Sequence, residues 1–467
     1  MSEVPLPAAL GRPIEIMSVL HVNIIGAGLG GLCLAQGLRR AGISFDVYER
    51  DPAPDARFQG YRLRIDANGL DALTECLPDG GIDRVRERAA VARAGGRFVT
   101  PQLEDAKVVL PPSWHDAHTD SAVTDHRQRT TTAAARPTPH VPDIPGDVSV
   151  HRQTLREILL DGILDRVHFG KSFSRTTTIA DGRRVAHFDD GTHSLPGLVI
   201  AADGTQSRVR EYVLPGMAPR ETGDICIYGL TPLSTALLVL MDAHGEATTM
   251  EGSTVVFADG FAVIVEAMLF RRPPRGDMAA VAPATPSTVG TPGEMPLTPV
   301  SDYLYWAFIG PSRTLLGPAY TCAEMPDAMP LARIESMTQS WHPHLGSLFS
   351  HAVPETVRVS PVRSTASPLP WQIDGVAGLG DAVHAMSPAG GLGANTALRD
   401  AAQLTRHLRT VADGHVPLWQ AITAYERDMC ERAREAVRLA DAGAALLNAR
   451  RGPSCASTQK SADLMHL

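Results

Sequence analysis

Short apolar runs alternate with helix-period segments in the first part of the chain. Residues 21–50, HVNIIGAGLGGLCLAQGLRRAGISFDVYER, have the pattern of an apolar strand, a glycine turn, a helix and a second strand. Leu32, Ala35 and Leu38 recur at helical spacing, and Gly42 suits the end of that helix. The first strand, VNIIG, is almost continuously apolar, which is typical of a parallel sheet covered on both faces. The pattern predicts a βαβ unit.

The middle of the chain has a different pattern. Between residues 222 and 365 the runs are longer and alternate in polarity, as in DICIYGLTPL, GFAVIVEAMLF and DYLYWAFIG. Alternation of this kind predicts an antiparallel sheet. An apolar strand then returns at GVAGLGDAVH, and an amphipathic helix is expected over 418–447. Its apolar positions are Trp419, Ile422, Met429, Val437 and Leu447.

These patterns predict an α/β fold, with a Rossmann-like nucleotide lobe interleaved with an antiparallel substrate lobe and followed by C-terminal helices. Two Pro-, Thr- and Ala-rich stretches lack apolar periodicity and are expected to be insertions. The expected boundaries are a flexible extension at 1–18, with Met17 as an alternative start; the nucleotide lobe at 19–110, 147–221 and 366–410, with an insertion at 111–146; the substrate lobe at 222–365, with an insertion at 271–299; a C-terminal helix at 411–450; and a loose tail at 451–467.

Composition narrows the class of protein. The 467 residues are too many for one small core, and a net charge of -8 without a basic stripe argues against a nucleic-acid partner. No run of 18 or more apolar residues occurs, so no transmembrane helix is indicated, and no secretory signal is evident. The six cysteines form no C-x-x-C pair, which favours free thiols in a reducing compartment, hence the cytoplasm. The oligomeric state stays open.

The glycine turn carries the first chemical motif. Gly26, Gly28 and Gly31 match G-x-G-x-x-G, in which the glycines allow a tight turn, close approach of a pyrophosphate and close helix packing. Glu49 ends the second strand, where a carboxylate can accept hydrogen bonds from an adenosine ribose. The sequence therefore predicts dinucleotide binding, although the turn alone does not distinguish a nicotinamide from a flavin.

Two later motifs bear on that choice. Asp203 and Gly204 follow the apolar strand LVIAA and precede a polar helix start that contains Arg208 and Arg210. In GLGDAVHAMSPAGGLGAN, Asp381 ends a strand, where it can bind ribityl hydroxyls, and a turn follows. The amides that open the next helix are expected to face the pyrimidine edge of a flavin. The residues of this third motif are Asp381, Pro388, Gly391, Gly393, Ala394 and Asn395.

Together the three motifs resemble the class A FAD-dependent aromatic monooxygenases, which have the p-hydroxybenzoate hydroxylase fold. The resemblance covers most of residues 19–447. The family pattern D-G-x-x-S-x-x-R is met at Asp203, Gly204, Ser207 and Arg210, although Ala201 replaces the usual glycine before it. By the resemblance, this pattern touches the flavin and the incoming nicotinamide.

Further roles follow only from the resemblance. Arg152, in VHRQTLREIL, corresponds to an arginine that binds FAD. The segment GYRLRID, which begins with Gly60, occupies the place of an arginine linked to flavin movement, and either Arg62 or Arg64 fits. No catalytic residue is certain; the candidates are Arg62, Arg64, Arg208 and Tyr228. Pocket candidates are Tyr228, Tyr303, Tyr305 and Trp306, which packing in a core explains equally well.

The resemblance implies that NAD(P)H reduces FAD and that O2 then supplies one oxygen atom to an aromatic, polyketide-like or alkaloid substrate, by hydroxylation or epoxidation, in secondary metabolism. One alternative is a flavin-binding protein without turnover. Another is a flavin-dependent halogenase, although the W-x-W-x-I-P motif of that group is absent. His342 and His344 have metal-like spacing but lack a partner cluster, so no metal is expected. For His384 we favour packing over proton transfer.

Overall fold

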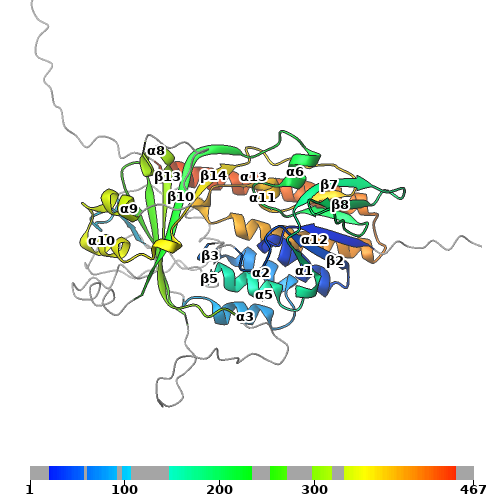
Figure 1. Ribbon diagram of the computed structural model, residues 1–467, viewed down its shortest axis with the longest axis horizontal. Helices are drawn as coiled ribbons and strands as arrows, with labels where there is room; N and C mark the ends of the chain where they lie inside the picture. Colours follow the sequence, from blue (N-terminus) through cyan, green and yellow to red (C-terminus); the bar gives the residue numbers. More distant parts are fainter. Residues whose placement is uncertain are drawn as a thin grey trace, which may run out of the picture.

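The computed structural model describes residues 20–56, 60–91, 97–106, 147–233, 253–270, 297–317 and 331–448. A parallel sheet with its helices occupies one end of the long axis, and an antiparallel sheet lies toward the other end (Figure 1). The predicted α/β fold with an antiparallel lobe is therefore confirmed. The expected extension at 1–18, the insertion at 111–146, most of the insertion at 271–299 and the tail at 451–467 lie outside the described residues.

The parallel sheet collects strands from distant parts of the chain. Its order is β15-β9-β1-β2-β6, and every neighbouring pair is parallel. All five residues of β1 are buried, which agrees with the continuous apolar run in the sequence. The strands are β1 (His21–Ile25), β2 (Ser44–Glu49), β6 (Val167–Phe169), β9 (Leu198–Ala201) and β15 (Val376–Gly378).

The antiparallel sheet has the order β14-β10-β13-β12-β11-β4. The sequence pattern predicted the long central strands, but it did not predict the edge strand β4, which comes from the first hundred residues and pairs in parallel with β11. The strands are β4 (Arg97–Val99), β10 (Arg220–Pro232), β11 (Ser253–Phe257), β12 (Ala262–Met268), β13 (Tyr303–Pro311) and β14 (Arg358–Ser364).

The two faces of this sheet have different neighbours. The outer face carries Trp306 and Phe308, which pack with Phe349 and with the helices α8 (Ser312–Leu315), α9 (Leu331–Thr338) and α10 (Pro343–Ser350). Trp306 is fully buried there, so the interpretation of Trp306 as a pocket residue is wrong, because its side chain points away from the nucleotide lobe. The inner face carries Tyr228, Ile264 and Tyr305 and packs with residues of the nucleotide lobe.

Smaller elements complete the nucleotide lobe. Two short antiparallel pairs, β3–β5 and β7–β8, flank the parallel sheet. They are β3 (Arg62–Ile65), β5 (Val148–His151), β7 (Phe173–Thr178) and β8 (Arg184–Phe188). The helices are α1 (Leu29–Arg40), α2 (Ala67–Cys76), α3 (Gly81–Arg88), α5 (Arg152–Leu160), α6 (Arg208–Val213), α11 (Asp381–His384) and α12 (Gly393–Ala412), with 3-10 turns η1 (Leu164–Arg166), η3 (Pro354–Thr356) and η4 (Pro388–Gly390).

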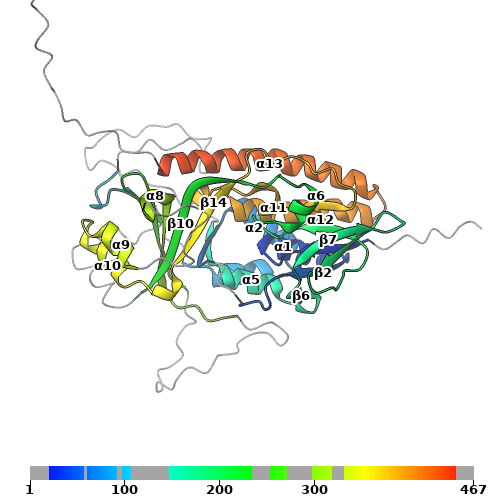
Figure 2. The same cartoon turned by 45° about the horizontal axis from the view of Figure 1, so that its top comes forward.

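The last helix, α13 (Leu418–Leu447), runs along the molecule beside both lobes (Figure 2). It packs on α12, and its final residue, Leu447, lies in the same cluster as Cys226 and Ile309 of the antiparallel sheet. Trp419 was expected on the apolar face, but its side chain is 67% exposed, because it lies in the first turn beyond the packed surface.

Two further expectations concern the cysteines and membrane-spanning helices. Of the cysteines in the described part of the chain, Cys33, Cys76, Cys226 and Cys430 are free and buried; Cys322 and Cys455 lie outside it. A search of the described helices finds none with both the length and the apolar character that crossing a membrane requires.

Candidate functional site

The glycine turn between β1 and α1 is close to other backbone on one side and open on the other. A Cβ on Gly26, whose φ is +110°, would lie 2.4 Å from the Ala202 carbonyl oxygen, and a Cβ on Gly31 would lie 2.2 Å from the Gly26 oxygen. Both positions therefore require glycine for packing. The nearest atom to a Cβ on Gly28 would be 4.0 Å away, so Gly28 leaves its side of the turn open.

Glu49 closes the turn from the end of β2. Its Oε2 accepts a hydrogen bond from the Ala27 amide at 2.7 Å, and its Oε1 accepts one from the Asp51 amide at 2.9 Å. The side chain is 6% exposed, yet it lines a pocket together with Gly26, Gly28 and Arg152. Because a carboxylate offers about four acceptor positions, Glu49 can hold the turn and still accept from a ligand.

The second motif follows β9 and lines the same pocket through Asp203, Gly204 and Arg208. Asp203 Oδ2 accepts from the amides of Arg208 at 2.8 Å and Val209 at 3.2 Å, and so caps the start of α6. Its other oxygen, Oδ1, is buried and has no hydrogen-bond partner among the residues that the structure describes, and burial raises the pKa of this carboxyl group. An unpartnered buried acceptor beside a pocket is a position where a ligand donor fits.

The two arginines of this motif differ in exposure. Arg208 is exposed and its Nη1 lies 2.5 Å from Asp189 Oδ2. Arg210 is only 5% exposed; its Nη1 donates to the Ala382 carbonyl and its Nη2 to the Thr205 carbonyl, each at 2.8 Å. Arg210 therefore joins the second motif to the third, and a visiting ligand would have to displace these contacts to reach it.

The third motif starts where β15 ends. Asp381 is exposed at the start of α11, and its Oδ2 lies 3.4 Å from Thr205 Oγ1 of the second motif. Pro388 begins η4, and the chain then turns at Gly391 into α12, which begins at Gly393. A Cβ on Gly393 would lie 3.9 Å from Asp381 Oδ1, so the exposed carboxylate faces the start of α12.

Asn395 ties this loop to the first part of the chain. Its Nδ2 donates to the Arg64 carbonyl at 3.1 Å and to the Gly391 carbonyl at 3.2 Å, and its Oδ1 accepts from the Asp66 amide at 3.1 Å. The side chain is therefore occupied by the protein itself. What the start of α12 offers a ligand is its backbone, at Gly393, Ala394 and Asn395.

Comparisons with known proteins agree with this arrangement. A family described as FAD binding domain matches residues 323–440, and a family described as NAD(P)-binding Rossmann-like domain matches residues 24–74. A solved structure, a putative FAD-containing monooxygenase from Photorhabdus luminescens, has 27% sequence identity and a TM-score of 0.68. Its alignment covers 92% of this chain and 98% of that one.

Curated relatives are also named as FAD-dependent monooxygenases. The dual O-methyltransferase/FAD-dependent monooxygenase elcB of Phaeosphaeria nodorum is 32% identical over 86% of this chain. The FAD-dependent monooxygenase vrtH of Penicillium aethiopicum is 27% identical over 89% of this chain and 90% of its own length. The chain is therefore similar to FAD-dependent monooxygenases, and the solved structures that it resembles have the p-hydroxybenzoate hydroxylase fold. It spans 41% of the length of elcB.

The residues of the three motifs fit FAD, the cofactor named for these relatives. The open side of Gly28, the acceptor capacity of Glu49 and the unpartnered Asp203 Oδ1 lie at one pocket. Amides at the start of α1 suit phosphates, because a helix N-terminus carries partial positive charge and free donors. These are the groups that a dinucleotide needs from a protein.

Two arginines of α5 lie next to this site. Arg152 lines the pocket, and a Cβ on Gly60, whose φ is +104°, would lie 3.6 Å from Arg152 Cδ. Arg156 was not predicted. It is fully buried, and its Nε donates to the Ala27 carbonyl of the glycine turn at 3.2 Å. A signal was present, since Arg156 lies one helical turn after Arg152 in the same expected helix.

The structure separates the roles of Arg62 and Arg64. Arg64 is partly exposed and pairs with Asp147, with Nη2 to Oδ2 at 2.7 Å. Arg62 points to the antiparallel sheet, where its Nη2 lies 2.5 Å from Glu266 Oε2 on β12. Burial alone would raise the pKa of Glu266, but Arg62 and the hydroxyls of Ser149 and Ser253 lower it. Sequence reasoning missed Glu266, although one charge inside the apolar strand AVIVEAM was a signal.

His384 and Asp400 form a fully buried pair beside the third motif. His384 Nε2 lies 2.5 Å from Asp400 Oδ2, and neither side chain is exposed. Burial opposes protonation of His384, but Asp400 outweighs this effect and raises the pKa of the imidazole. Asp400 Oδ2 also accepts from the Gly380 amide at 3.2 Å. The pair therefore fixes the turn that presents Asp381, which supports the packing role expected for His384.

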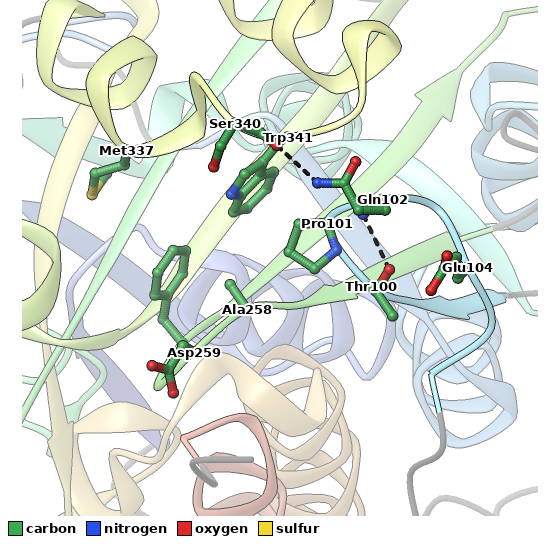
Figure 3. Close-up of a pocket in the computed structure, with 10 residues that line it drawn as sticks. Thr100, Pro101, Gln102, Glu104, Ala258, Asp259, Met337, Ser340 and Trp341 are labelled. Atoms are coloured by element: carbon green, nitrogen blue, oxygen red, sulfur yellow. Dashed lines mark hydrogen bonds between the residues drawn. The ribbon is translucent and has the colours of Figure 1, made fainter. Parts of the chain in front are cut away.

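Two other features lie away from these motifs. His342 Nδ1 accepts from the His344 amide at 3.3 Å and caps α10; the described residues contain no group of three metal-ligating side chains. Near α9 and α10, Figure 3 shows a hollow lined by Pro101, Asp259 and Trp341, where Gln102 Nε2 donates to the Ser340 carbonyl. None of the predicted site residues lines this hollow.

Proposed function

We propose that this chain is the monooxygenase part of a protein that uses NAD(P)H and O2 to hydroxylate or epoxidise an aromatic, polyketide-like or alkaloid molecule. The observation that carries the proposal is the contact between the third motif, which shares a site with the other two, and the inner face of the antiparallel sheet. Ala389 of η4 lies in one hydrophobic cluster with Val255 and Ala307 of that sheet, and Tyr228 and Tyr305 pack against the same cluster.

Within this proposal the residues divide the work of holding FAD. Gly26, Gly28 and Gly31 bring the pyrophosphate to the start of α1, and Glu49 binds the ribose. Asp381 binds ribityl hydroxyls, and the first turn of α12 faces the pyrimidine edge. When bound, FAD accepts reducing equivalents from NAD(P)H and activates O2, while the protein orients the substrate and excludes water.

The structure supports turnover over simple flavin storage. A storage protein needs the cofactor pocket alone, whereas this chain also places partly buried Tyr228, Ile264 and Tyr305 on the sheet face beside the third motif. A halogenase is not favoured by the relatives, which are named monooxygenases. Uric acid and salicylate appear in the names of two neighbouring structures of similar fold, so we propose a small, ring-containing substrate.

A direct test begins with the purified protein. We expect it to be yellow and to release intact FAD on heating, because no step of the proposal needs a covalent link. Supplied with isotopically labelled O2, NAD(P)H and an extract of host metabolites, it should place one labelled atom in one product. NADH and NADPH compared in parallel identify the donor. Release of FMN, or oxidation of NAD(P)H that yields only hydrogen peroxide with every fraction, would contradict the proposal.

A further inference from the structure

Glu266 lies at the centre of the inner face of the antiparallel sheet. In the strand register it is opposite Ser253 on β11 and opposite Tyr305 on β13. Tyr228 and Ile264 are both paired with Ala307, the next inward-facing residue along β13. The small Ala307 side chain, which is 1% exposed, therefore lies between two larger partly buried ones. A carboxylate and partly buried apolar and aromatic side chains therefore share this face.

Within the described part of the chain, three hydrogen-bond donors reach the Glu266 carboxylate. Ser149 Oγ donates to Oε1 at 2.5 Å, and the hydroxyl of Ser253 donates to Oε2. Arg62 Nη2 also binds Oε2, at 2.5 Å. A carboxylate has about four acceptor positions, so one remains on Oε1, the oxygen with a single donor. The side chain of Glu266 is 10% exposed and that of Arg62 is 15% exposed.

The charges of Arg62 and Glu266 determine which kind of ligand group can bind the remaining acceptor position on Oε1. Arg62 and Glu266 together are neutral, so a second anion would gain no net attraction from them. A cation would meet the guanidinium of Arg62 beside the carboxylate. A neutral hydroxyl donor satisfies the acceptor without adding charge, and its bond to an ionised oxygen is stronger than a neutral one.

We propose that Glu266 anchors the substrate by accepting a hydrogen bond from a phenolic or enolic hydroxyl, whose ring lies on the surface formed by Tyr228, Ile264 and Tyr305. This inference rests on the proposed function and adds the substrate class. Arg62, Ser149 and Ser253 hold the carboxylate in place and are positioning residues. A phenol that donates to a carboxylate gains electron density on its ring, which favours attack of a ring carbon on an electrophilic oxygen.

Equilibrium binding tests the anchor without turnover. Oxidised holoenzyme is titrated with 1-naphthol and with 1-methoxynaphthalene, which has the same rings but no hydroxyl donor, and the change in flavin absorbance gives each Kd. We expect the wild-type protein to bind 1-naphthol about tenfold or more tightly than the ether, as for a hydrogen bond to a charged group. In Glu266→Leu this ratio should fall to about one.

A second buried glutamate provides a matched control. Glu157 on α5 is 6% exposed and also accepts three hydrogen bonds, from Gln153 and Thr298, away from the sheet face. Glu157→Gln should keep the wild-type ratio of Kd values. If Glu266→Leu does not retain FAD, Glu266→Gln decides, because loss of the charge should reduce the ratio to about a third.

The proposed role of Glu266 is refuted if the Glu266 variant that retains FAD has the wild-type ratio of Kd values. It is also refuted if the wild-type protein does not bind 1-naphthol. Because no NAD(P)H is present, a protein that binds 1-naphthol through Glu266 but never oxygenates a substrate would refute the proposed function alone. A protein that oxygenates its substrate with unchanged Kd ratios would refute the anchor alone.

Discussion

Glu49 and Asp381 are both assigned to FAD, but the protein itself uses them to different extents. Both oxygens of Glu49 already accept backbone amides, and the residue is 6% exposed. Asp381 is exposed, and among the described residues its side chain has one hydrogen-bond partner, Thr205 Oγ1 at 3.4 Å. Loss of Glu49 should therefore disturb the fold of the turn as well as binding, whereas loss of Asp381 should affect mainly the cofactor.

We expect Asp381→Ala to weaken FAD binding about 5- to 150-fold, because an unpaired hydroxyl costs roughly 1–3 kcal/mol. The melting temperature of the apoprotein should stay within about 2 °C of wild type, since the side chain is exposed. Flavin fluorescence during titration of apoprotein measures the affinity. Asp413→Ala, an equally exposed aspartate at the other end of α12, is the control. Equal affinities for the two variants would show that the third motif does not hold the ribityl chain.

Arg152 and Arg210 should differ in whether their loss affects mainly FAD binding or mainly the stability of the apoprotein. Arg210→Ala leaves the buried carbonyl of Ala382 and the partly buried carbonyl of Thr205 without their donors, so the apoprotein itself should lose about 2–5 kcal/mol of stability. Arg152→Ala should reduce FAD affinity with a smaller effect on the apoprotein, because Arg152 lines the cofactor pocket. Urea unfolding of both apoproteins and FAD titration measure the two effects. If Arg210→Ala apoprotein unfolds like wild type but holoenzyme is reduced slowly by NADPH, Arg210 serves the nicotinamide, as the sequence resemblance implied.

At the scale of elements, the third motif depends on the junction of α11, α12 and α13. Asp400 on α12 binds His384 of α11 and the Gly380 amide, and its Oδ1 lies 3.4 Å from Arg432 Nη2 on α13. One fully buried carboxylate thus holds three successive helices together. Breaking such a buried pair by removing one partner typically costs about 3–5 kcal/mol.

This junction predicts a pH dependence of stability. The pKa of His384 is raised in the folded protein, so the pair contributes fully below the unfolded pKa of about 6.5 and is lost as pH rises through the folded value. In Asp400→Asn, His384 should be neutral when folded, and this loss of stability above pH 6.5 should disappear. Melting temperatures of apoprotein across neutral and alkaline pH, with His415→Gln as an exposed control, measure it. A wild-type slope retained in Asp400→Asn would contradict the assignment.

At the scale of the whole molecule, α13 connects the two lobes. In its first third, Tyr425 donates to the Gly378 carbonyl of β15, in the parallel sheet. At its end, Leu447 packs with Cys226 and Ile309 of the antiparallel sheet, in the cluster that contains Ala389 of η4. The position of the inner sheet face relative to the third motif therefore depends on one continuous helix (Figure 2).

Two substitutions in α13 test this connection. Leu447→Ala should lower stability by about 2–5 kcal/mol, because the side chain is 1% exposed and its loss leaves a cavity. Trp419→Ala removes a larger side chain from the same helix, but the effect should stay within about 0.5 kcal/mol, since this residue is 67% exposed. Chemical denaturation of both variants measures the difference. Equal losses would show that the helix packs on a different face.

The amino-acid sequence by itself determined the elements whose chemistry is local. Period and spacing predicted the βαβ unit, the alternating strands and the helix at 418–447, because burial on one face leaves a regular pattern. The glycines of the first turn were recognisable because close backbone contacts admit no Cβ. Only the tertiary structure decided which side chains meet. Arg62 and Glu266 lie about two hundred residues apart, and Trp306 and Tyr305 are neighbours on opposite faces of one strand. Such pairings depend on how lobes pack and on which face each strand turns inward, and no local pattern records either.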